Sequence, residues 1–234
     1  MLTSPKYIED AGIKGSPVTY SWKPYQGIAI ASTYPKNFEK LVRGLTLRAT
    51  LVLGVGIGEW LRWRLDGLTS YQRCSQYVEA LWTRTVSRLY LKNDHLERPE
   101  DKGDPAIGAL LALEQGLYNM LVKVSYDEPD RAQSVAELVP LVRYTMKDTS
   151  KFDDWLKTVL KRFIDNFKID DDNRGGDLVP RAFLDPAVPI DPDAVPKLLD
   201  EQLCQIKWKG NPFLATPNEM LAQGFDGKPY RYTS

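Results

Sequence analysis

The chain has 234 residues, and its 31 Lys and Arg side chains balance 31 Asp and Glu side chains, so its formal net charge is zero. This length suits one large domain or two small ones, and 43% hydrophobic with 26% charged residues is typical of a globular protein with a sizeable core. The balanced charge argues against non-specific nucleic-acid binding, and one histidine with two cysteines excludes most metal sites and a disulfide scaffold.

No targeting or membrane segment is expected. Residues 1–10 lack a basic stretch followed by an apolar one, and the most apolar window, residues 49–57, is shorter than the roughly 18 to 20 residues of a membrane span. Cys74 and Cys204 fall in helical patterns, where we expect small buried hydrophobic side chains rather than a disulfide. These features predict a cytoplasmic protein that does not associate with a membrane.

The first part of the chain predicts an irregular arm followed by two helices. Residues 1–34 are rich in Pro, Gly, Ser, Thr and Tyr without a helical period, and residues 28–30 suggest one short strand. Apolar residues then recur at helical spacing through 35–66, which predicts one long helix that Gly67 ends. A second amphipathic helix is expected over 70–91.

A charged loop over 92–103 separates these helices from two more. The helix predicted over 104–122 begins with an Asp-Pro pair, an N-cap followed by a first-turn proline. Because it is apolar on nearly every side, we expect it at the centre of the fold. The next helix, over 131–146, contains Pro140, which removes a backbone donor and predicts a kink or a break.

The last third of the chain predicts two further helices and a tail. A fifth helix, capped near Thr149 or Ser150, carries a broad apolar stripe to residue 167. The segment 168–190 is rich in Asp and Pro, and a sixth helix is expected over 191–205. Residues 216–224 then contain a capping box and a terminal glycine, which predict a short final helix.

These elements predict an all-α fold: a single domain of about six helices with an irregular N-terminal arm and an ordered C-terminal tail. The arm, residues 1–34, is expected to pack on a helical core over 35–167. Residues 168–234 supply the acidic and Pro-rich connection, the sixth helix and the tail. Because the candidate strands are few and short, an α/β sheet is the less favoured alternative.

Glycines in the first long helix suggest a close helix crossing. The run Gly54-Val-Gly-Ile-Gly58 does not match the dinucleotide fingerprint, which needs Gly-x-Gly-x-x-Gly between a strand and a helix. Within a helix, the first and last of these glycines share a face, and the helix over 104–122 has small residues at the same interval. We expect the two helices to cross at Gly54, Gly58, Gly108, Ala112 and Gly116.

The ionisable side chains favour structural roles. His95 lies in the charged loop without a reactive Ser or Cys motif, so we expect it to be solvated. Glu59 is expected to form an ordinary surface ladder with Arg62 and Asp66. Glu114 is harder to expose within its apolar helix, and we predict a buried ion pair with Arg, Tyr or Trp donors on a neighbouring helix.

Charge is segregated along the chain. Segment 35–91 has nine basic and four acidic residues, a net charge of +5, whereas segment 169–193 has two basic and seven acidic residues, a net charge of −5. Two interpretations stay open: the acidic segment packs internally against the basic helices, or one of the two stays accessible and steers a charged protein partner. On the second interpretation the partner-binding residues are Asp170, Asp171, Asp172, Asp177, Arg84 and Arg88.

The sequence favours a non-enzymatic cytoplasmic protein that binds another protein and uses no cofactor or metal. An immunity protein that neutralises a bacterial toxin by direct binding and an adaptor or chaperone for a secreted effector both fit this description. Aromatic residues near the two ends, such as Tyr25 and Trp208, are candidate interface anchors. The alternative is an enzyme that acts with Mg²⁺ on a phosphorylated substrate through carboxylates such as Glu114 or those of 170–172. Helical DNA binding is a third hypothesis.

Overall fold

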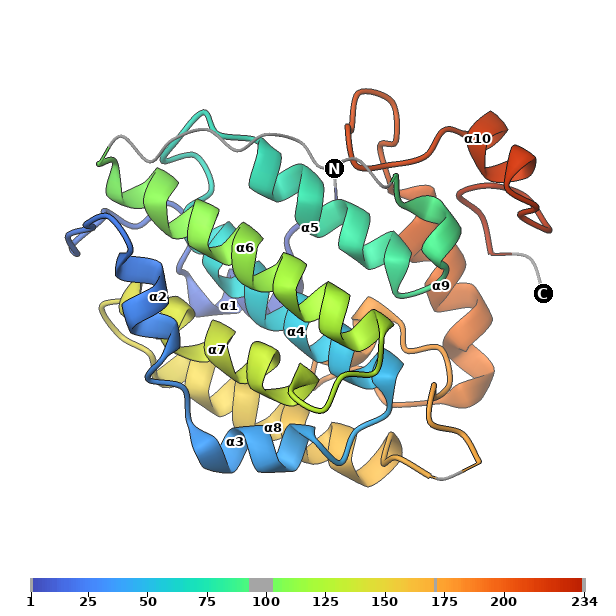
Figure 1. Cartoon of the computed structure of the whole chain (residues 1–234), viewed down its shortest axis with the longest axis horizontal. Coiled ribbons are helices and arrows are strands. Elements are labelled where there is room, and N and C mark those ends of the chain that lie inside the picture. The colour runs from blue at the N-terminus through green and yellow to red at the C-terminus, as the bar shows by residue number, and fades with distance from the viewer. Residues whose placement is uncertain (1, 93–102, 171, 233–234) are drawn as a thin grey trace.

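All regular secondary structure is helical in the part of the chain that the computed structural model describes, which is residues 2–92, 103–170 and 172–232. Over these residues ten α-helices and three 3₁₀ turns follow one another (Figure 1). Isolated bridges join Leu45 to Lys168 and Leu91 to Leu214, without forming a strand. The predicted all-α class is therefore confirmed, with more helices than the expected six.

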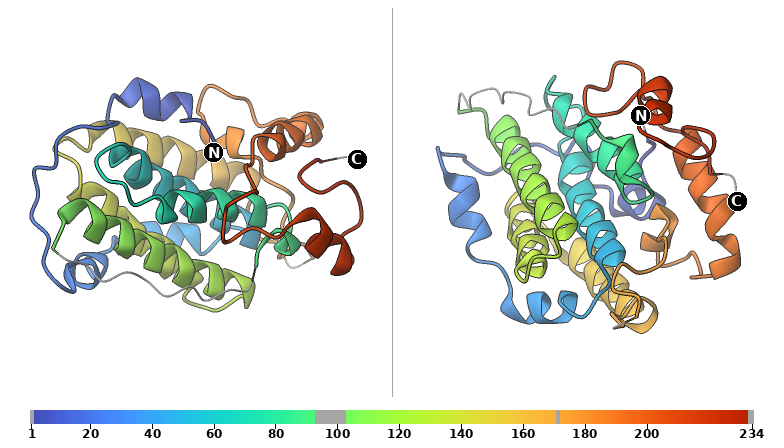
Figure 2. Two further views of the ribbon diagram at one scale, coloured as in Figure 1. Left: turned by 90° about the horizontal axis from the view of Figure 1, so that it is seen from above. Right: turned by 45° about the vertical axis from the view of Figure 1, so that its right-hand side comes forward.

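Helix α4 (Leu47–Arg64) occupies the centre of the fold. Sixteen of its side-chain positions, from residue 49 to residue 64, are buried. It packs against α5 (Arg73–Arg84), α6 (Pro105–Ser125), α7 (Arg131–Tyr144) and α8 (Ser150–Asn166), and Figures 1 and 2 show it in the middle of the bundle. The expectation that the helix over 104–122 is central is wrong, because α6 leaves half-exposed side chains along one side.

The glycines of α4 let its neighbours approach closely, but the predicted crossing of small residues takes another form. A Cβ atom at Gly54 would overlap Met120 of α6, and one at Gly58 would lie 3.2 Å from Leu117 of α6. The small residues of α6 face elsewhere: a Cβ at Gly116 would lie 2.7 Å from a methyl group of Leu138 in α7. Large side chains of α6 therefore fill the space that the glycines of α4 leave. Gly108 is buried in the first turn of α6.

The long helix expected over 35–66 is divided into two. Helix α3 (Lys36–Val42) ends before a four-residue connection, and α4 starts with Thr46 as its N-cap, whose hydroxyl accepts from the Ala49 amide at 3.4 Å. The connection pairs with the end of α8, because the Thr46 amide donates to the Phe167 carbonyl at 3.0 Å. Tertiary hydrogen bonds thus break a helix that the apolar periodicity alone would continue.

The N-terminal arm contains two short helices, α1 (Lys6–Ala11) and α2 (Gln26–Ala31), so the strand expected at 28–30 is wrong. Tyr25 begins α2 in the left-handed conformation, with φ of 64°. Gly27 then allows α2 to rest on α6, since a Cβ at this position would lie only 2.6 Å from the Cβ of Ala112. The arm is therefore packed on the helical body.

Several other boundaries differ from the prediction. Helix α5 ends at Arg84 and is followed by the 3₁₀ turn η1 (Arg88–Tyr90), although one helix to residue 91 was expected. Helix α7 continues through Pro140 without the break that a proline favours. Helix α8 begins at Ser150, as its capping signals predict.

The C-terminal third is built from short elements. These are the 3₁₀ turns η2 (Arg181–Leu184) and η3 (Pro192–Ala194) and the helices α9 (Val195–Cys204) and α10 (Pro217–Ala222). The predicted capping box of α10 is confirmed, with Thr216 and Glu219 bonded reciprocally. Over the residues described, no helix combines the length and apolarity that crossing a bilayer requires.

Candidate functional site

The two groups of predicted partner-binding residues lie near one another, at the end of the molecule where α5 ends and α4 begins. Arg84 is the last residue of α5, Arg88 opens η1, and Arg48 lies in the first turn of α4. The acidic segment reaches the same place, because the Arg48 Nη1 donates to the Gly176 carbonyl at 2.5 Å and its amide donates to the Gly175 carbonyl at 3.1 Å.

The acidic segment packs through its backbone while its carboxylates face solvent. Asp170, Asp172 and Asp177 are exposed. Asp170 accepts from the Asp172 amide at 3.0 Å, and Asp177 accepts from the Asn173 side chain at 3.4 Å. Asp171 lies outside the described residues. The contacts of the segment with α4 are internal packing, as one of the two interpretations expects, but the described carboxylates remain accessible.

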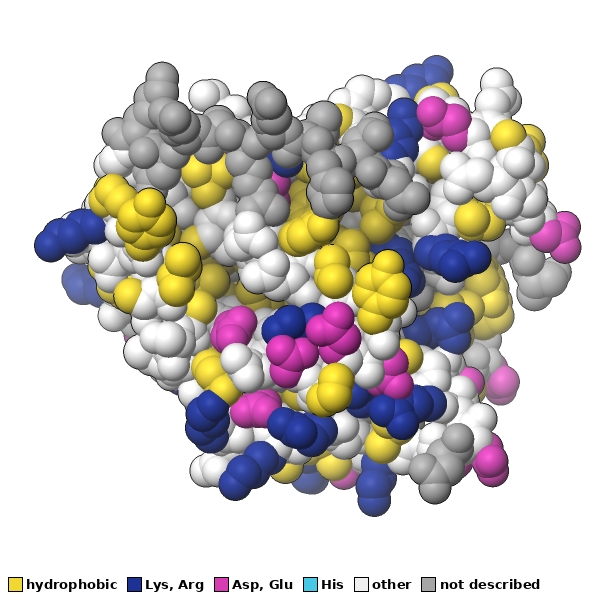
Figure 3. All heavy atoms as spheres, in the orientation of Figure 1, with side chains coloured by type: hydrophobic (Ala, Val, Ile, Leu, Met, Phe, Trp, Pro, Cys, Tyr) yellow, Lys and Arg dark blue, Asp and Glu magenta, His cyan; other side chains and the backbone are white. Residues whose placement is uncertain are grey.

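We call Arg48, Arg84 and Arg88 the arginine face. Arg48 and Arg88 are exposed, and the half-buried Arg84 donates to the Ser125 hydroxyl at the end of α6, at 3.1 Å. Burial, and next the charges of Arg48 and Arg88, lower the pKa of Arg84. Throughout the described chain, no carboxylate pairs with any of the three. Figure 3 shows Lys and Arg side chains gathered on the right of this face of the molecule, where α5 ends.

An exposed aromatic residue borders the arginine face. Tyr126 follows Ser125, the partner of Arg84, and is 78% exposed. Exposed Tyr and Arg side chains together are typical of protein interfaces, where they supply much of the binding energy. Arginines drawn from α4, α5 and η1 and a tyrosine from the end of α6 thus form a surface that no single sequence segment contains.

Most aromatic residues near the chain ends serve packing rather than interface contact. Tyr20 and Trp22 pack edge-on against Tyr144, with ring centroids 5.5 and 6.0 Å apart. Trp208 stacks on Tyr230. Tyr25 differs, because it is 83% exposed.

Glu114 is buried and paired, in the way the sequence suggests. Its side chain is 3% exposed and accepts hydrogen bonds from Arg73 Nε and from the Tyr71 hydroxyl, each at 3.0 Å. Burial, and next the charge of Glu114, raise the pKa of Tyr71 above the usual range for tyrosine. This carboxylate links α6 to the start of α5 and is satisfied by structural partners.

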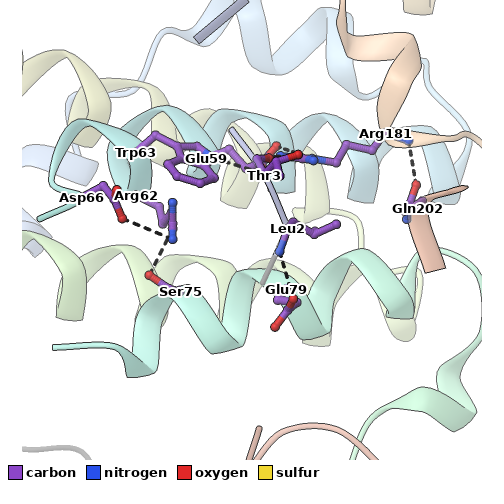
Figure 4. A network of polar contacts seen from close by, with 10 residues as sticks. All are labelled: Leu2, Thr3, Glu59, Arg62, Trp63, Asp66, Ser75, Glu79, Arg181 and Gln202. Atoms are coloured by element: carbon purple, nitrogen blue, oxygen red, sulfur yellow. Dashed lines mark hydrogen bonds and ion pairs between the residues drawn. The ribbon is translucent and has the colours of Figure 1, made fainter. Parts of the chain in front are cut away.

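The prediction that Glu59 forms surface ion pairs with Arg62 and Asp66 is wrong, because both Glu59 and Arg62 are buried. Glu59 is 1% exposed and accepts from Arg181 Nε at 3.0 Å and from Arg181 Nη2 at 2.5 Å (Figure 4). Arg62 does pair with Asp66, at 3.4 Å, and also donates to the Ser75 hydroxyl at 3.1 Å. The partner of Glu59 comes from a segment 122 positions away, which no local spacing rule could identify.

The same network holds the N-terminal residues over α4 and α5. Arg181 Nη2 donates to the Thr3 carbonyl at 2.9 Å, and the Leu2 amide donates to the buried Glu79 carboxylate at 3.0 Å (Figure 4). The Lys207 amide and the Asn211 side chain also donate to Glu79. Buried carboxylates of α4 and α5 therefore anchor the N-terminal residues and parts of the C-terminal third.

A cavity of about 200 Å³ adjoins this network, between residues 2–7, η2 and α9. Arg181 and Gln202 lie in its wall. The sequence did not indicate this site, because Arg181 lies in the Asp- and Pro-rich segment 168–190, where no local spacing identifies its partner.

The other residues that the sequence suggested for metal, phosphate or thiol chemistry do not come together in one site in the described part of the chain. Among the described residues, no three His, Cys, Asp or Glu side chains are arranged to hold a metal ion. Gly54, Gly56 and Gly58 lie inside α4 rather than in a phosphate-binding loop. Cys74 is buried as expected, but Cys204 is exposed, contrary to expectation. His95 lies outside the described residues.

Comparisons with protein-family models, with curated proteins and with solved structures found no match to this chain.

Proposed function

We propose that this protein is a non-enzymatic cytoplasmic protein that binds an acidic partner protein through the arginine face and Tyr126. The arrangement of the three arginines carries the proposal: they lie near one another where α4 begins and α5 ends, and in the described part of the chain no carboxylate neutralises them. Burial, and next the charges of Arg48 and Arg88, lower the pKa of Arg84. Carboxylates of a partner would relieve this mutual repulsion and form charge-assisted hydrogen bonds with the guanidinium groups.

The charge pattern around the face favours a protein over a nucleic acid. The exposed carboxylates of Asp172 and Asp177 belong to the segment whose backbone receives the Arg48 hydrogen bond. A phosphate backbone would meet these negative charges beside the arginines, whereas a protein can oppose both signs with a complementary pattern. The zero net charge of the chain also gives no long-range attraction to a nucleic acid.

Two roles are consistent with such a surface. An immunity protein would cover the surface of a bacterial toxin, and an adaptor or chaperone would hold a secreted effector. Both act by direct binding and need no cofactor.

Site-specific crosslinking in the native host tests the proposal. A photoreactive amino acid replaces Tyr126 in one variant and Tyr25, which is exposed to a similar degree, in the control. We expect one acidic protein to crosslink at position 126 and none at position 25. The charge reversal Arg84→Glu with Arg88→Glu should abolish this product, whereas the matched reversal Lys151→Glu with Lys157→Glu on the exposed side of α8 should keep it. Equal crosslinking at both positions, or recovery of nucleic acid alone at position 126, contradicts the proposal.

A further inference from the structure

The cavity beside Arg181 has the features of a binding site for a small molecule. It has a volume of about 200 Å³, below the range of roughly 300 to 1,000 Å³ that is typical of drug-sized ligands, so it suits a compact molecule. Its apolar wall includes Leu2, Val188 and Leu198, and its polar wall includes Arg181 and the carboxylates of Asp185 and Glu201. This combination of an apolar surface with a few polar groups is typical of ligand pockets.

Arg181 presents fixed hydrogen-bond donors at this cavity. A guanidinium has five N–H groups, and here Nε and Nη2 are committed to Glu59 and to the Thr3 carbonyl. Within the described chain, Nη1 has no hydrogen-bond partner, although the side chain is only 13% exposed. Because Glu59 holds the guanidinium in place, Nη1 can donate a hydrogen bond to a ligand oxygen without reorganisation of the side chain.

Tyr7 of α1 also lines the cavity. Its ring stacks on Trp155 with centroids 5.3 Å apart, which fixes the position of the side chain. Its hydroxyl is buried without a hydrogen-bond partner in the described structure, so Tyr7 contributes ring surface to the wall rather than a polar contact.

The charged side chains of the cavity wall balance one another. Arg181 and Lys6 are basic, Asp185 and Glu201 are acidic, and the four sum to zero. A ligand that offers both a donor and an acceptor without net charge can contact groups of both signs in this wall, whereas an anion would meet the two carboxylates and a cation the two basic groups.

We propose that the cavity binds a small aliphatic molecule of zero net charge that carries both an oxygen acceptor and an N–H donor. The oxygen accepts from Arg181 Nη1, the N–H group donates to a wall carboxylate, and the aliphatic group packs on Leu2, Val188 and Leu198. A zwitterionic amino acid and a neutral amide share this chemistry. The site is separate from the arginine face and does not depend on the proposed function.

Four probes with the same isobutyl group test the ligand class by calorimetric titration of the full chain. Leucine and isovaleramide have zero net charge, whereas isovalerate and isoamylamine carry one charge each. We expect saturable one-site binding of leucine or isovaleramide, at least tenfold tighter than binding of either charged probe. Whichever of leucine and isovaleramide binds more tightly shows whether the site prefers a zwitterion or a neutral amide. Failure of both to bind, or equal binding of a charged probe, overturns the proposal.

Two variants locate the binding. Val188→Phe fills the cavity without altering the Arg181 side chain, and we expect at least a tenfold loss of affinity at an unchanged melting temperature. Val195→Phe on α9, away from the cavity wall, is the matched control and should bind as the wild type does. Arg181→Lys keeps the charge beside Glu59 but removes Nη1, and it should cause a similar loss of affinity. This variant provides the test if Val188→Phe does not fold. Wild-type affinity in both cavity variants overturns the proposal.

Discussion

Arg181 of η2 and Glu59 of α4 form a buried ion pair in which Arg181 Nε lies 3.0 Å from Glu59 Oε2. The pair fastens the C-terminal third of the chain to the central helix, and through the Thr3 carbonyl it also holds the N-terminal residues. Glu59 is 1% exposed and the Arg181 side chain 13% exposed, so the pair is largely shielded from water, and Arg181 is accessible mainly at the wall of the adjoining cavity.

Removal of one partner of this pair should be strongly destabilising. We expect Glu59→Met to lower the free energy of unfolding by about 3–5 kcal/mol, because it leaves a largely buried guanidinium without its counter-charge. The double variant Glu59→Met with Arg181→Met should lose less, since neither charge remains. Denaturant unfolding of the wild type, both single variants and the double variant measures the coupling, and Asp10→Asn in the exposed pair with Lys6 should show no measurable change. A double variant that loses as much as the sum of the single variants would contradict this account.

Gly27 should be required for the docking of α2 on α6. Gly27→Ala places a Cβ 2.6 Å from the Cβ of Ala112, a contact that only backbone movement can relieve. We expect a loss of about 1–3 kcal/mol in unfolding free energy. Gly175→Ala is the control, because a Cβ there meets nothing within 4 Å, and its effect should stay within about 0.5 kcal/mol. Equal effects of the two substitutions would show that α2 does not pack as described.

The two cysteines should differ in reactivity. Burial raises the pKa of the Cys74 thiol far above the usual range for cysteine, so at pH 8 it stays protonated and inaccessible, whereas Cys204 is exposed. A thiol reagent should modify one equivalent in the native protein and two after unfolding. Mass spectrometry of the native product should find the label on Cys204, and a label on Cys74 would contradict the packing of α5.

Stability should fall at alkaline pH through the half-buried Tyr20. Burial raises the pKa of Tyr20 from about 10 to about 12, and its hydroxyl donates to the Pro105 carbonyl at 3.2 Å. The folded state therefore retains a proton that the unfolded chain releases, so this contribution is fully present below pH 10 and is lost as pH rises towards 12. Tyr20→Phe should flatten the decline of unfolding free energy over this range. An unchanged slope would contradict the prediction.

Mg²⁺ should not stabilise the protein. Asp170 and Asp172 are exposed at the end of α8, while Glu114 is engaged by Arg73 and Tyr71 on another side of α4. A ligand that binds the native state raises the melting temperature, so titration with millimolar Mg²⁺ tests the alternative enzymatic hypothesis directly. We expect no shift, and a saturable increase that Glu114→Gln removes would revive that hypothesis.

Signals that act within one or two helical turns were sufficient to predict much of the fold. Asp104 accepts hydrogen bonds from the Ala106 and Ile107 amides at the start of α6, and the capping box of α10 forms as its spacing predicts. The broad apolar stripe of α8 likewise produces a helix with one buried face. Capping and periodicity depend on neighbours along the chain, so the sequence alone determined the all-α class and these boundaries.

Contacts between distant segments decided the rest. The break before α4 depends on hydrogen bonds to the end of α8, and the arginine face forms only because α5 and η1 bring Arg84 and Arg88 near Arg48. A distant contact also explains why Glu59 does not form the expected surface ion pairs with Arg62 and Asp66: it pairs with Arg181 in the interior instead. Interaction between positions 122 apart requires the packing of intervening helices, so only the tertiary structure places these charges together.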